Sequence, residues 1–338
     1  MRFQLRLAGR HALDRPQSPE CERIPAVRYH LVYRSSAGES AKGRPSFYSK
    51  LVALTSTLRA AAHLPDGDRI FVNDGAIPEP RASQMAAAGE ILTLLGSVGN
   101  AGSYCTCVAL VHSRGWADED VVYFAEDDYL HTDDAFLRLV EAVQALPDVA
   151  YFTLYDHPDY YRLRLHRRFM ARHSTSTKVG PVTWRAVRST CLTYAARVRA
   201  LRADSWVHYL CSRGPTPRDF AIWSILEGAG YVVPRLLKPA GDPDVRTLLR
   251  RHVGRAVRSG VWSFVDRRAG DDMPRLLDPS SPFADRTRMG RTFARILSRR
   301  ESQGSALYAA QPGFATHLED EMLAPGRDWA RIAAASKA

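Results

Sequence analysis

The stretch Val121-Val-Tyr-Phe-Ala-Glu-Asp-Asp-Tyr-Leu-His131 decides the fold of this chain. Its first five residues are apolar and rich in β-branched and aromatic side chains, which predicts a strand buried on both faces of a sheet. Three consecutive carboxylates, Glu126, Asp127 and Asp128, follow at its carboxyl end. Because ligands of open α/β sheets bind outside the carboxyl ends of the strands, we expect a ligand site here.

Adjacent like charges raise one another's pKa unless a cation or several donors compensate them. Hard divalent cations prefer oxygen ligands, and Mg²⁺ or Mn²⁺ is typically held by one or two carboxylates together with substrate phosphates. The three carboxylates therefore favour a metal–diphosphate site. A solvated acidic turn is the alternative interpretation of the same residues.

Strands and helices alternate on both sides of this stretch. Strands are predicted over 27–34, 69–74 and 90–95, and helices over 46–62, from the glycine-rich turn at 96–103 to residue 112, and over 132–146. Ser46 is the predicted N-cap of the first helix. This alternation predicts an α/β protein with a parallel or mixed sheet.

The second half of the chain changes character after residue 238. Before it, strands are predicted over 151–155, 190–194 and 231–234, and helices from 197 and over 217–228. The expected organisation is an irregular leader at 1–25, a catalytic core at 26–238, an Arg-rich helical insertion or subdomain at 239–303, and a C-terminal segment at 304–338 that returns to the active site.

Composition narrows the class of protein but does not identify what it binds. The 338 residues carry a net charge of +11, and only five of the 47 basic residues are lysine. This bias is typical of a GC-rich coding sequence, and it is compatible with an anionic substrate or an anionic membrane surface. No nucleic-acid-binding motif accompanies the charge, so we expect no specific nucleic-acid partner.

Targeting and cysteine patterns favour a cytoplasmic protein. No apolar run is long enough to span a membrane, and the Arg-rich N-terminus lacks the pattern of a secretory signal. The five cysteines are odd in number and lack zinc-type spacing, which predicts reduced thiols.

The order of the motifs resembles that of the GT-A type nucleotide-sugar-dependent glycosyltransferases, and is similar to glycosyltransferase family 2. The resemblance covers residues 27–238 and 306–329, and it rests on strands ending at Arg34 and Asp74, the Gly99-Asn-Ala-Gly102 turn, the acidic stretch, and the late Gly313-Phe-Ala-Thr-His317. It implies a bacterial enzyme with a GT-A (Rossmann-like) mixed sheet flanked by helices, and a helical insertion near the C-terminus.

The resemblance also implies roles for the acidic residues. In this family an Asp-x-Asp motif contacts the donor ribose and coordinates Mg²⁺ or Mn²⁺; here Glu126 and Asp128 stand at its outer positions. Asp128 is the expected metal ligand, and Glu126 and Asp127 are expected to contact the nucleotide. A histidine in the C-terminal segment often completes the metal shell, which implies His317 as a ligand and favours Mn²⁺.

Further nucleotide contacts are expected at the ends of the first strands. Arg34 and Asp74 are candidates for binding the base and ribose, and Asn100 lies in the glycine-rich turn where the backbone can approach the nucleotide. Asp74 has an alternative role, since an Asp in an Asn-Asp-Gly sequence often stabilises the turn itself.

Two carboxylates are candidates for the general base that deprotonates the acceptor. Asp219 opens the helix predicted at 217–228 and resembles the family's base, although an Asp in the first turn also stabilises the helix dipole. Asp156, at the end of its own strand, is the second candidate, for base or acceptor contact.

The leading hypothesis is a metal-dependent glycosyltransferase that moves a sugar from a nucleoside-diphosphate sugar to a hydroxyl acceptor. One alternative is a nucleotidyltransferase that makes the sugar nucleotide, and Arg34 to Gly43 only loosely resembles the signature of that class. The other is a non-enzymatic basic module for nucleic acid or for peripheral contact with an anionic membrane.

Overall fold

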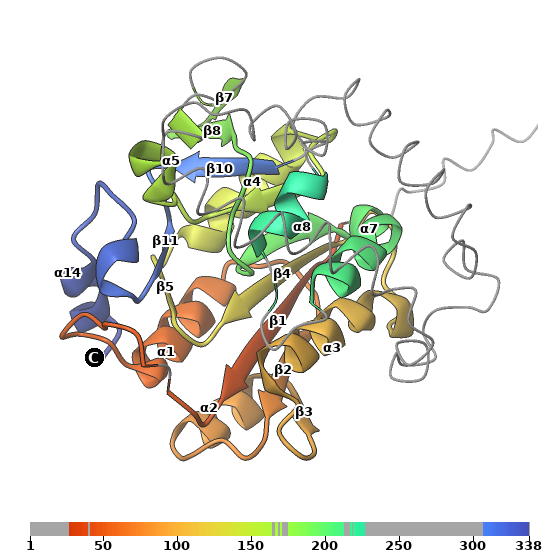
Figure 1. Cartoon of the computed structure of the whole chain (residues 1–338), viewed down its shortest axis with the longest axis vertical. Helices are drawn as coiled ribbons and strands as arrows, with labels where there is room; N and C mark the ends of the chain where they lie inside the picture. The colour runs from red at the N-terminus through yellow and green to blue at the C-terminus, as the bar shows by residue number, and fades with distance from the viewer. Residues whose placement is uncertain are drawn as a thin grey trace, which may run out of the picture.

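The computed structural model describes residues 27–39, 41–163, 166–167, 170, 175–212, 217, 219–226 and 307–337 (Figure 1). The predicted leader at 1–25, the strand at 231–234 and the Arg-rich insertion at 239–303 lie outside the described residues.

One large mixed sheet forms the centre of the described structure (Figure 1). Its order is β3-β2-β1-β4-β9-β6-β10-β8-β7. The strands are β1 (Tyr29–Ser36), β2 (Arg69–Asp74), β3 (Glu90–Leu94), β4 (Val121–Glu126), β6 (Tyr151–Thr153), β7 (Ser176–Val179), β8 (Val182–Ala186), β9 (Tyr194–Arg197) and β10 (Leu307–Gln311). The predicted α/β class with a mixed sheet flanked by helices is confirmed.

Strand direction brings several carboxyl ends to one edge of the sheet. β1 is parallel to both β2 and β4. β9 is antiparallel to β4 and to β6, and β10 is parallel to β6, so β6 and β10 run in the direction of β4. The chain leaves β1 for β2 on one side and returns as β4 on the other. Such a reversal of strand order opens a crevice at the carboxyl ends.

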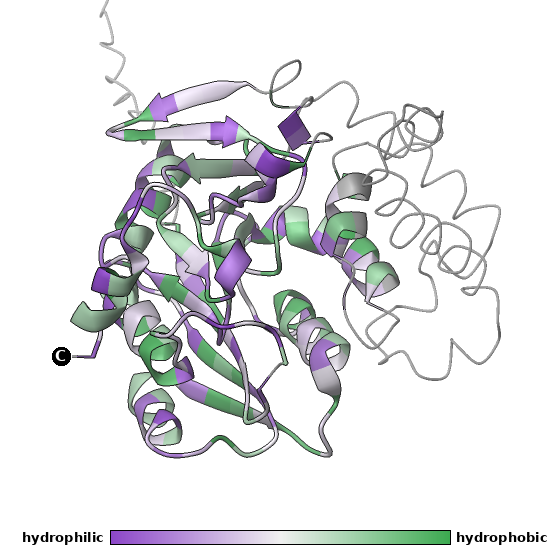
Figure 2. Cartoon of the chain, turned by 60° about the vertical axis from the view of Figure 1, so that its left-hand side comes forward, coloured by the Kyte–Doolittle hydropathy of each residue, from purple (hydrophilic) through white to green (hydrophobic). Residues whose placement is uncertain are grey.

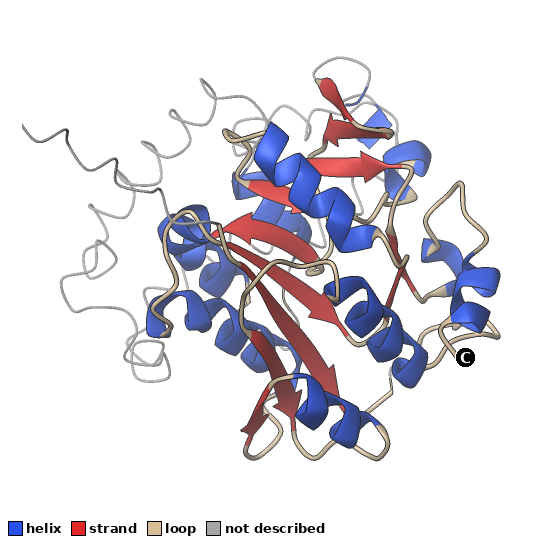
Figure 3. Cartoon of the chain, turned by 180° about the vertical axis from the view of Figure 1, so that it is seen from behind, coloured by secondary structure: helices blue, strands red, loops and turns tan. Residues whose placement is uncertain are grey.

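Helices cover both faces of the sheet, and each face has its own hydrophobic core (Figure 3). α1 (Lys50–Ala61), α2 (Arg81–Ala88), α4 (Ala135–Ala145) and α14 (Trp329–Ala335) pack on one face, and α3 (Gly99–Ser113), α7 (Val198–Cys211) and α8 (Asp219–Leu226) pack on the other. The short α5 (Asp159–Arg162) and η4 (Asp320–Met322) complete the described helices. Figure 2 shows hydrophobic residues concentrated on the strands and on the helix faces that meet them.

The C-terminal segment is part of the sheet and of a second, two-stranded one. β10 lies between β6 and β8, so the sheet includes residues from both ends of the described sequence. β11 (Ala315–His317) pairs antiparallel with β5 (Tyr129–His131), with His317 opposite Tyr129. This pairing brings the late Thr-His motif beside the end of the acidic stretch.

Two predicted boundaries are wrong. The first helix starts at Lys50, and its N-cap is Ser49 rather than Ser46, because Ser49 accepts from the Val52 amide while Tyr48 N–H closes a turn onto Pro45. The strand predicted over 190–194 overlaps β9 only at Tyr194, where β9 starts; the two alanines in the middle of β9 are depleted in strands and do not mark its position.

None of the helices in the described part of the chain has the length and apolarity needed to cross a membrane. The described cysteines are Cys105, Cys107, Cys191 and Cys211, and their reduced state remains a prediction.

Candidate active site

A polar cavity of about 500 Å³ lies at the carboxyl ends of β1, β2 and β4. Glu126, Asp127 and Asp128 form one wall, and they are called the carboxylate triplet below. The remaining lining residues come from the ends of β1 and β2, the segment that leads from β1 to α1, and the start of α3: Arg34, Ser35, Ser36, Ala37, Gly38, Glu39, Arg44, Lys50, Asp74, Ser97, Gly99, Asn100 and Ser103.

Glu126 forms an ion pair with Arg34, the last basic residue of β1. The same guanidinium donates to the Asn100 side chain at 2.7 Å and to Ser103 Oγ at 3.1 Å, which fixes it against the start of α3. Burial raises the pKa of Glu126, the charge of Arg34 opposes this rise, and the charges of Asp128 and Asp219 add to it. Two predicted nucleotide contacts, Arg34 and Asn100, are therefore held together beside the cavity.

Asp127 is held on the α1 side of the sheet, opposite to the α3 side on which Arg34 is fixed. Its Oδ2 accepts from Ser35 Oγ at 2.9 Å, from the Ser36 amide at 2.9 Å and from Lys50 Nζ at 2.9 Å, and Arg81 lies 3.6 Å away. Lys50 and Arg81 are both buried. Asp127 thus connects β4 to β1, α1 and α2; its predicted contact with the nucleotide remains a prediction.

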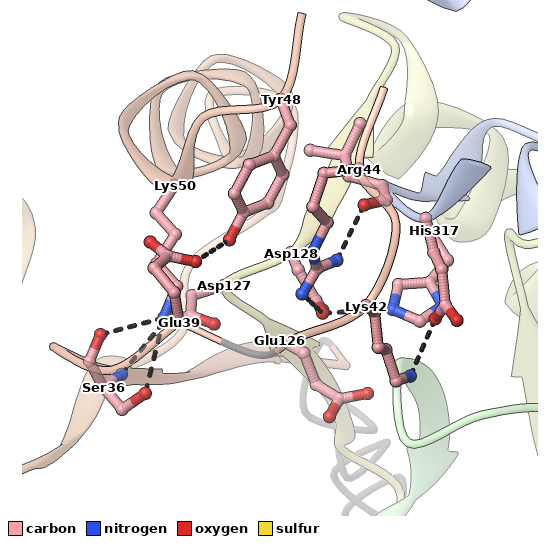
Figure 4. Close-up of polar contacts among 12 residues, drawn as sticks. Ser36, Glu39, Lys42, Arg44, Tyr48, Lys50, Glu126, Asp127, Asp128 and His317 are labelled. Carbon is pink, nitrogen blue, oxygen red and sulfur yellow. Dashed lines mark hydrogen bonds and ion pairs between the residues drawn. The ribbon is translucent and has the colours of Figure 1, made fainter. Parts of the chain in front are cut away.

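Asp128 lies between two basic side chains, as Figure 4 shows. Its Oδ2 is 3.1 Å from Arg44 Nη2 and 3.0 Å from His317 Nε2. Burial alone raises the pKa of Asp128, but the hydrogen bonds and charges of His317 and Arg44 outweigh it and hold this pKa well below its ordinary value. Each member of the carboxylate triplet therefore has its own basic partner.

His317 is fixed by packing and by a second carboxylate. Its ring stacks on the buried Tyr129 with centroids 4.9 Å apart, and its Nδ1 lies 3.5 Å from Glu319 Oε2. Glu319 beside Nδ1 orients the ring, as a second carboxylate does for metal-ligating histidines, while Nε2 faces Asp128 Oδ2.

The described residues contain no group of three or more His, Cys, Asp or Glu side chains arranged to hold a metal ion. Two ligands do converge, since the 3.0 Å between Asp128 Oδ2 and His317 Nε2 matches neighbouring ligands of an octahedral cation, each about 2.1 Å from the metal. Mg²⁺ sites typically complete their shell with substrate phosphates and water. The pair fits a cation that is completed by a bound diphosphate.

Asp74 stabilises the start of α3. Its two oxygens accept from the Val98 amide at 2.7 Å and the Gly99 amide at 2.8 Å, so it caps that helix rather than its own Asn-Asp-Gly turn. Gly99 has a φ of 74°, which favours glycine at this position. Asp74 still lines the cavity, and its predicted contact with the base remains a prediction.

Asp219 opens α8, where its Oδ1 accepts from the Phe220 amide at 2.7 Å. Its charge raises the pKa of Glu126 and of Cys191, so it lies within electrostatic range of the carboxylate triplet. A carboxylate in the first helical turn also stabilises the helix dipole.

Asp156 follows β6 at the same sheet edge but is not among the residues that line the cavity. Its carboxylate is buried, and it accepts from Tyr161 Oη at 2.9 Å and from Gln311 Nε2 at 3.2 Å. Burial raises the pKa of Asp156 to about 6, although these two hydrogen bonds and the charge of Arg185 oppose the rise.

Sequence reasoning missed the cations that neutralise Asp127 and Asp128. Arg44 lies in the connection from β1 to α1, Lys50 is the first residue of α1, and Arg81 is the first residue of α2. Only the rarity of lysine could have drawn attention to Lys50, one of five in the chain, at the start of an apolar helix. Arg44 and Arg81 are two of many arginines, and no spacing marks them.

No protein-family model matches the sequence. No curated protein matches it either. Solved structures do show similarity at low identity. Glucosyl-3-phosphoglycerate synthase from Mycobacterium tuberculosis, in complex with Mn²⁺, UDP and glucosyl-3-phosphoglycerate, is 10% identical over 69% of this chain and 80% of that chain, with a TM-score of 0.38.

Two further structures are similar at the same level. TarS of S. aureus is 11% identical over 82% of this chain and 50% of that chain, with a TM-score of 0.37. CMP:2-keto-3-deoxy-manno-octonic acid synthetase with CTP is 13% identical over 53% of this chain and 78% of that chain, with a TM-score of 0.32. The similar structures include glycosyltransferases and nucleotidyltransferases. Likenesses of this size leave the reaction to be argued from the site.

Asp127 gives the first testable expectation. Asp127→Asn removes the charge that Lys50 and the Ser36 amide surround, so the free energy of unfolding should fall by about 3 kcal/mol. Asp133→Asn is the matched control, because Asp133 is exposed and pairs with Arg59 at the surface; its loss should stay below about 1 kcal/mol. Urea unfolding measures both, and equal losses would contradict a structural role for Asp127.

Asp156 gives a pH-dependent expectation. Its folded pKa of about 6 lies above the value of an unfolded Asp, so the protonated carboxyl stabilises the fold fully below about pH 4, and this contribution is lost as the pH rises through 6. Asp156→Asn keeps the neutral form. Relative to the wild type, the variant should gain up to about 3 kcal/mol of unfolding free energy between pH 4 and pH 7.5. A difference that stays constant over this range would exclude a raised pKa.

Proposed function

We propose that this protein is a metal-dependent glycosyltransferase, which moves a sugar from a nucleoside-diphosphate sugar to a hydroxyl acceptor. The observation that carries the proposal is the convergence of Asp128 and His317 beside a polar cavity at the carboxyl ends of β1, β2 and β4. A cavity at the reversal of strand order is where an α/β sheet binds a nucleotide.

The donor's diphosphate would lie beside Asp128, with the nucleoside toward the start of α3. Asp128 and His317 would hold Mn²⁺ or Mg²⁺, which when bound neutralises the charge that develops on the leaving diphosphate. Arg34, Asp74 and Asn100 also line the cavity, where they can orient the base and the ribose. Glu126 is positioned between these groups by its ion pair with Arg34.

Asp219 is the proposed base that takes the proton of the acceptor hydroxyl. It lies close enough to Glu126 to raise that residue's pKa, and it opens α8, although it is not among the residues that line the cavity. Asp156 is the second candidate, since a pKa of about 6 suits a group that accepts a proton near neutral pH.

The nucleotidyltransferase alternative is less well supported by the cavity. Binding a triphosphate calls for several cations in the connection that follows the first strand, and Arg44, which lies there, is paired with Asp128. Lys50 is buried and bonded to Asp127 and to the Ser36 carbonyl, and Glu39 adds a negative charge to the cavity lining. The proposed contact with an anionic membrane rests on the 239–303 segment, outside the described residues.

Asp128 gives the test of the metal. UDP, GDP, CDP, ADP and TDP are tried in turn, and one of them together with Mn²⁺ should raise the melting temperature. A ligand that binds only the folded state stabilises it, and at 100 times its Kd it adds about 2.7 kcal/mol to the free energy of unfolding. Asp128→Asn should lose the Mn²⁺-dependent part of the shift. His317→Ala should lose a smaller part, since a phosphate-completed site keeps its carboxylate.

The same panel contains the control and the contradiction. Asp133→Asn, at an exposed side chain that does not line the cavity, should shift like the wild type. An Asp128→Asn protein with the full Mn²⁺-dependent shift would remove the metal from the proposal.

Asp219 gives the test of the base. Asp219→Asn keeps the shape of the side chain and removes its ability to accept a proton, so donor binding should stay nearly unchanged while transfer falls by about 10²- to 10⁴-fold. Release of the nucleoside diphosphate from the matching sugar nucleotide measures transfer. Near wild-type transfer would exclude Asp219 as base, and Asp156→Asn would then be measured in the same assay.

A further inference from the structure

Arg44 is a cation that already contacts the proposed metal ligand. Its Nη2 lies 3.1 Å from Asp128 Oδ2, the same oxygen that His317 Nε2 approaches at 3.0 Å (Figure 4). Arg44 also lines the nucleotide cavity. Its guanidinium therefore borders both the metal position and the space for the diphosphate.

Two further contacts hold Arg44 without involving the triplet. Its Nη1 donates to the Leu318 carbonyl at 2.7 Å, and its guanidinium lies over the Tyr48 ring, 4.5 Å from the centroid. The preceding Gly43 carbonyl accepts from the Asp320 amide at 3.2 Å. The contacts with Leu318 and Asp320 tie the guanidinium and the backbone before it to the C-terminal segment.

Arg44 and a divalent cation compete for one oxygen. A cation held by Asp128 and His317 would need the side of Asp128 Oδ2 that Arg44 and His317 now approach. A guanidinium 3.1 Å from the same oxygen would then face a like charge at close range in a partly buried site. His317 can remain as a ligand, but Arg44 must release Asp128.

A phosphate offers Arg44 an alternative partner. Guanidinium groups bind phosphate oxygens through two parallel hydrogen bonds, which makes arginine a preferred phosphate ligand. The cavity that Arg44 lines is the one in which the proposed function puts the diphosphate.

We propose that Arg44 is an internal counter-cation of Asp128, which opposes divalent-cation binding until a bound nucleoside diphosphate draws the guanidinium to its own phosphates. The inference rests on the proposed function and adds an order of events to it, in which the nucleotide draws Arg44 away before the cation binds Asp128 tightly. Cation and nucleotide then bind cooperatively, and each raises the affinity for the other by the same factor. Asp128 remains paired with a cation both before and after the exchange.

The test of the counter-cation is Mn²⁺ binding to the full chain, measured from the electron paramagnetic resonance signal of the free ion. The measurement is made with and without the nucleoside diphosphate that stabilises the protein. The wild type should bind Mn²⁺ weakly alone and strongly with the nucleotide. Arg44→Gln keeps an amide donor for the Leu318 carbonyl and removes the charge. Without nucleotide it should bind Mn²⁺ about tenfold tighter than the wild type, a typical coupling between two sites.

Two matched variants separate charge from structure. Arg44→Lys retains the positive charge and should keep Mn²⁺ binding weak in the absence of nucleotide. Lys42→Gln removes one charge from the same segment, at a half-exposed side chain that pairs with Glu319 instead of Asp128, and should change Mn²⁺ affinity far less.

The outcomes distinguish this inference from the function on which it rests. If the wild type binds Mn²⁺ with a nucleotide but Arg44→Gln binds Mn²⁺ alone no tighter than the wild type, the counter-cation is refuted and the metal-dependent function stands. Equal tightening in Lys42→Gln would also refute it, since the effect would then be one of net charge. If neither protein binds Mn²⁺ with any nucleotide, both the metal and the counter-cation are refuted.

Discussion

Neutralisation of three adjacent carboxylates at the end of β4 is the constraint on which the rest of the site depends. Glu126 is paired with Arg34, Asp127 with Lys50, and Asp128 with Arg44 and His317. Like charges so close together are tolerated only when each has a compensating partner. The partners come from β1, α1, the connection between them and the C-terminal segment, so compensation and tertiary structure are formed together.

The two faces of the sheet share this task. Arg34 holds Glu126 on the side of α3, where Asn100 and Ser103 also bind the guanidinium. Lys50 holds Asp127 on the side of α1. All three carboxylates line the cavity, and the middle one also holds the end of β4 to β1 and α1.

The sequence predicted what local patterns can encode. The strands β1, β2 and β4 were predicted because each contains a run of apolar residues. The acidic end of β4 was predicted as a site because three charged residues directly follow such a run. β7 was missed because its four residues are exposed or half-buried and form no apolar run. β9 was misplaced because its two middle residues are alanines, which are depleted in strands. Arg44, Lys50 and Arg81 were missed because the carboxylates they pair with are 46 or more residues away, and pairing at that range leaves no trace in spacing.

The position of β10 has a consequence for biosynthesis. This strand lies between β6 and β8, yet it follows the described part of α8 by 80 residues. During synthesis on the ribosome, β6 and β8 are complete long before β10, the strand that lies between them, emerges. Until then each of the two strands has one edge without its β10 partner. Such edges are templates for aggregation, and long-range pairing of this kind folds slowly. A nascent chain of this protein is therefore vulnerable late in translation, and a premature stop before Leu307 would leave that vulnerability permanent.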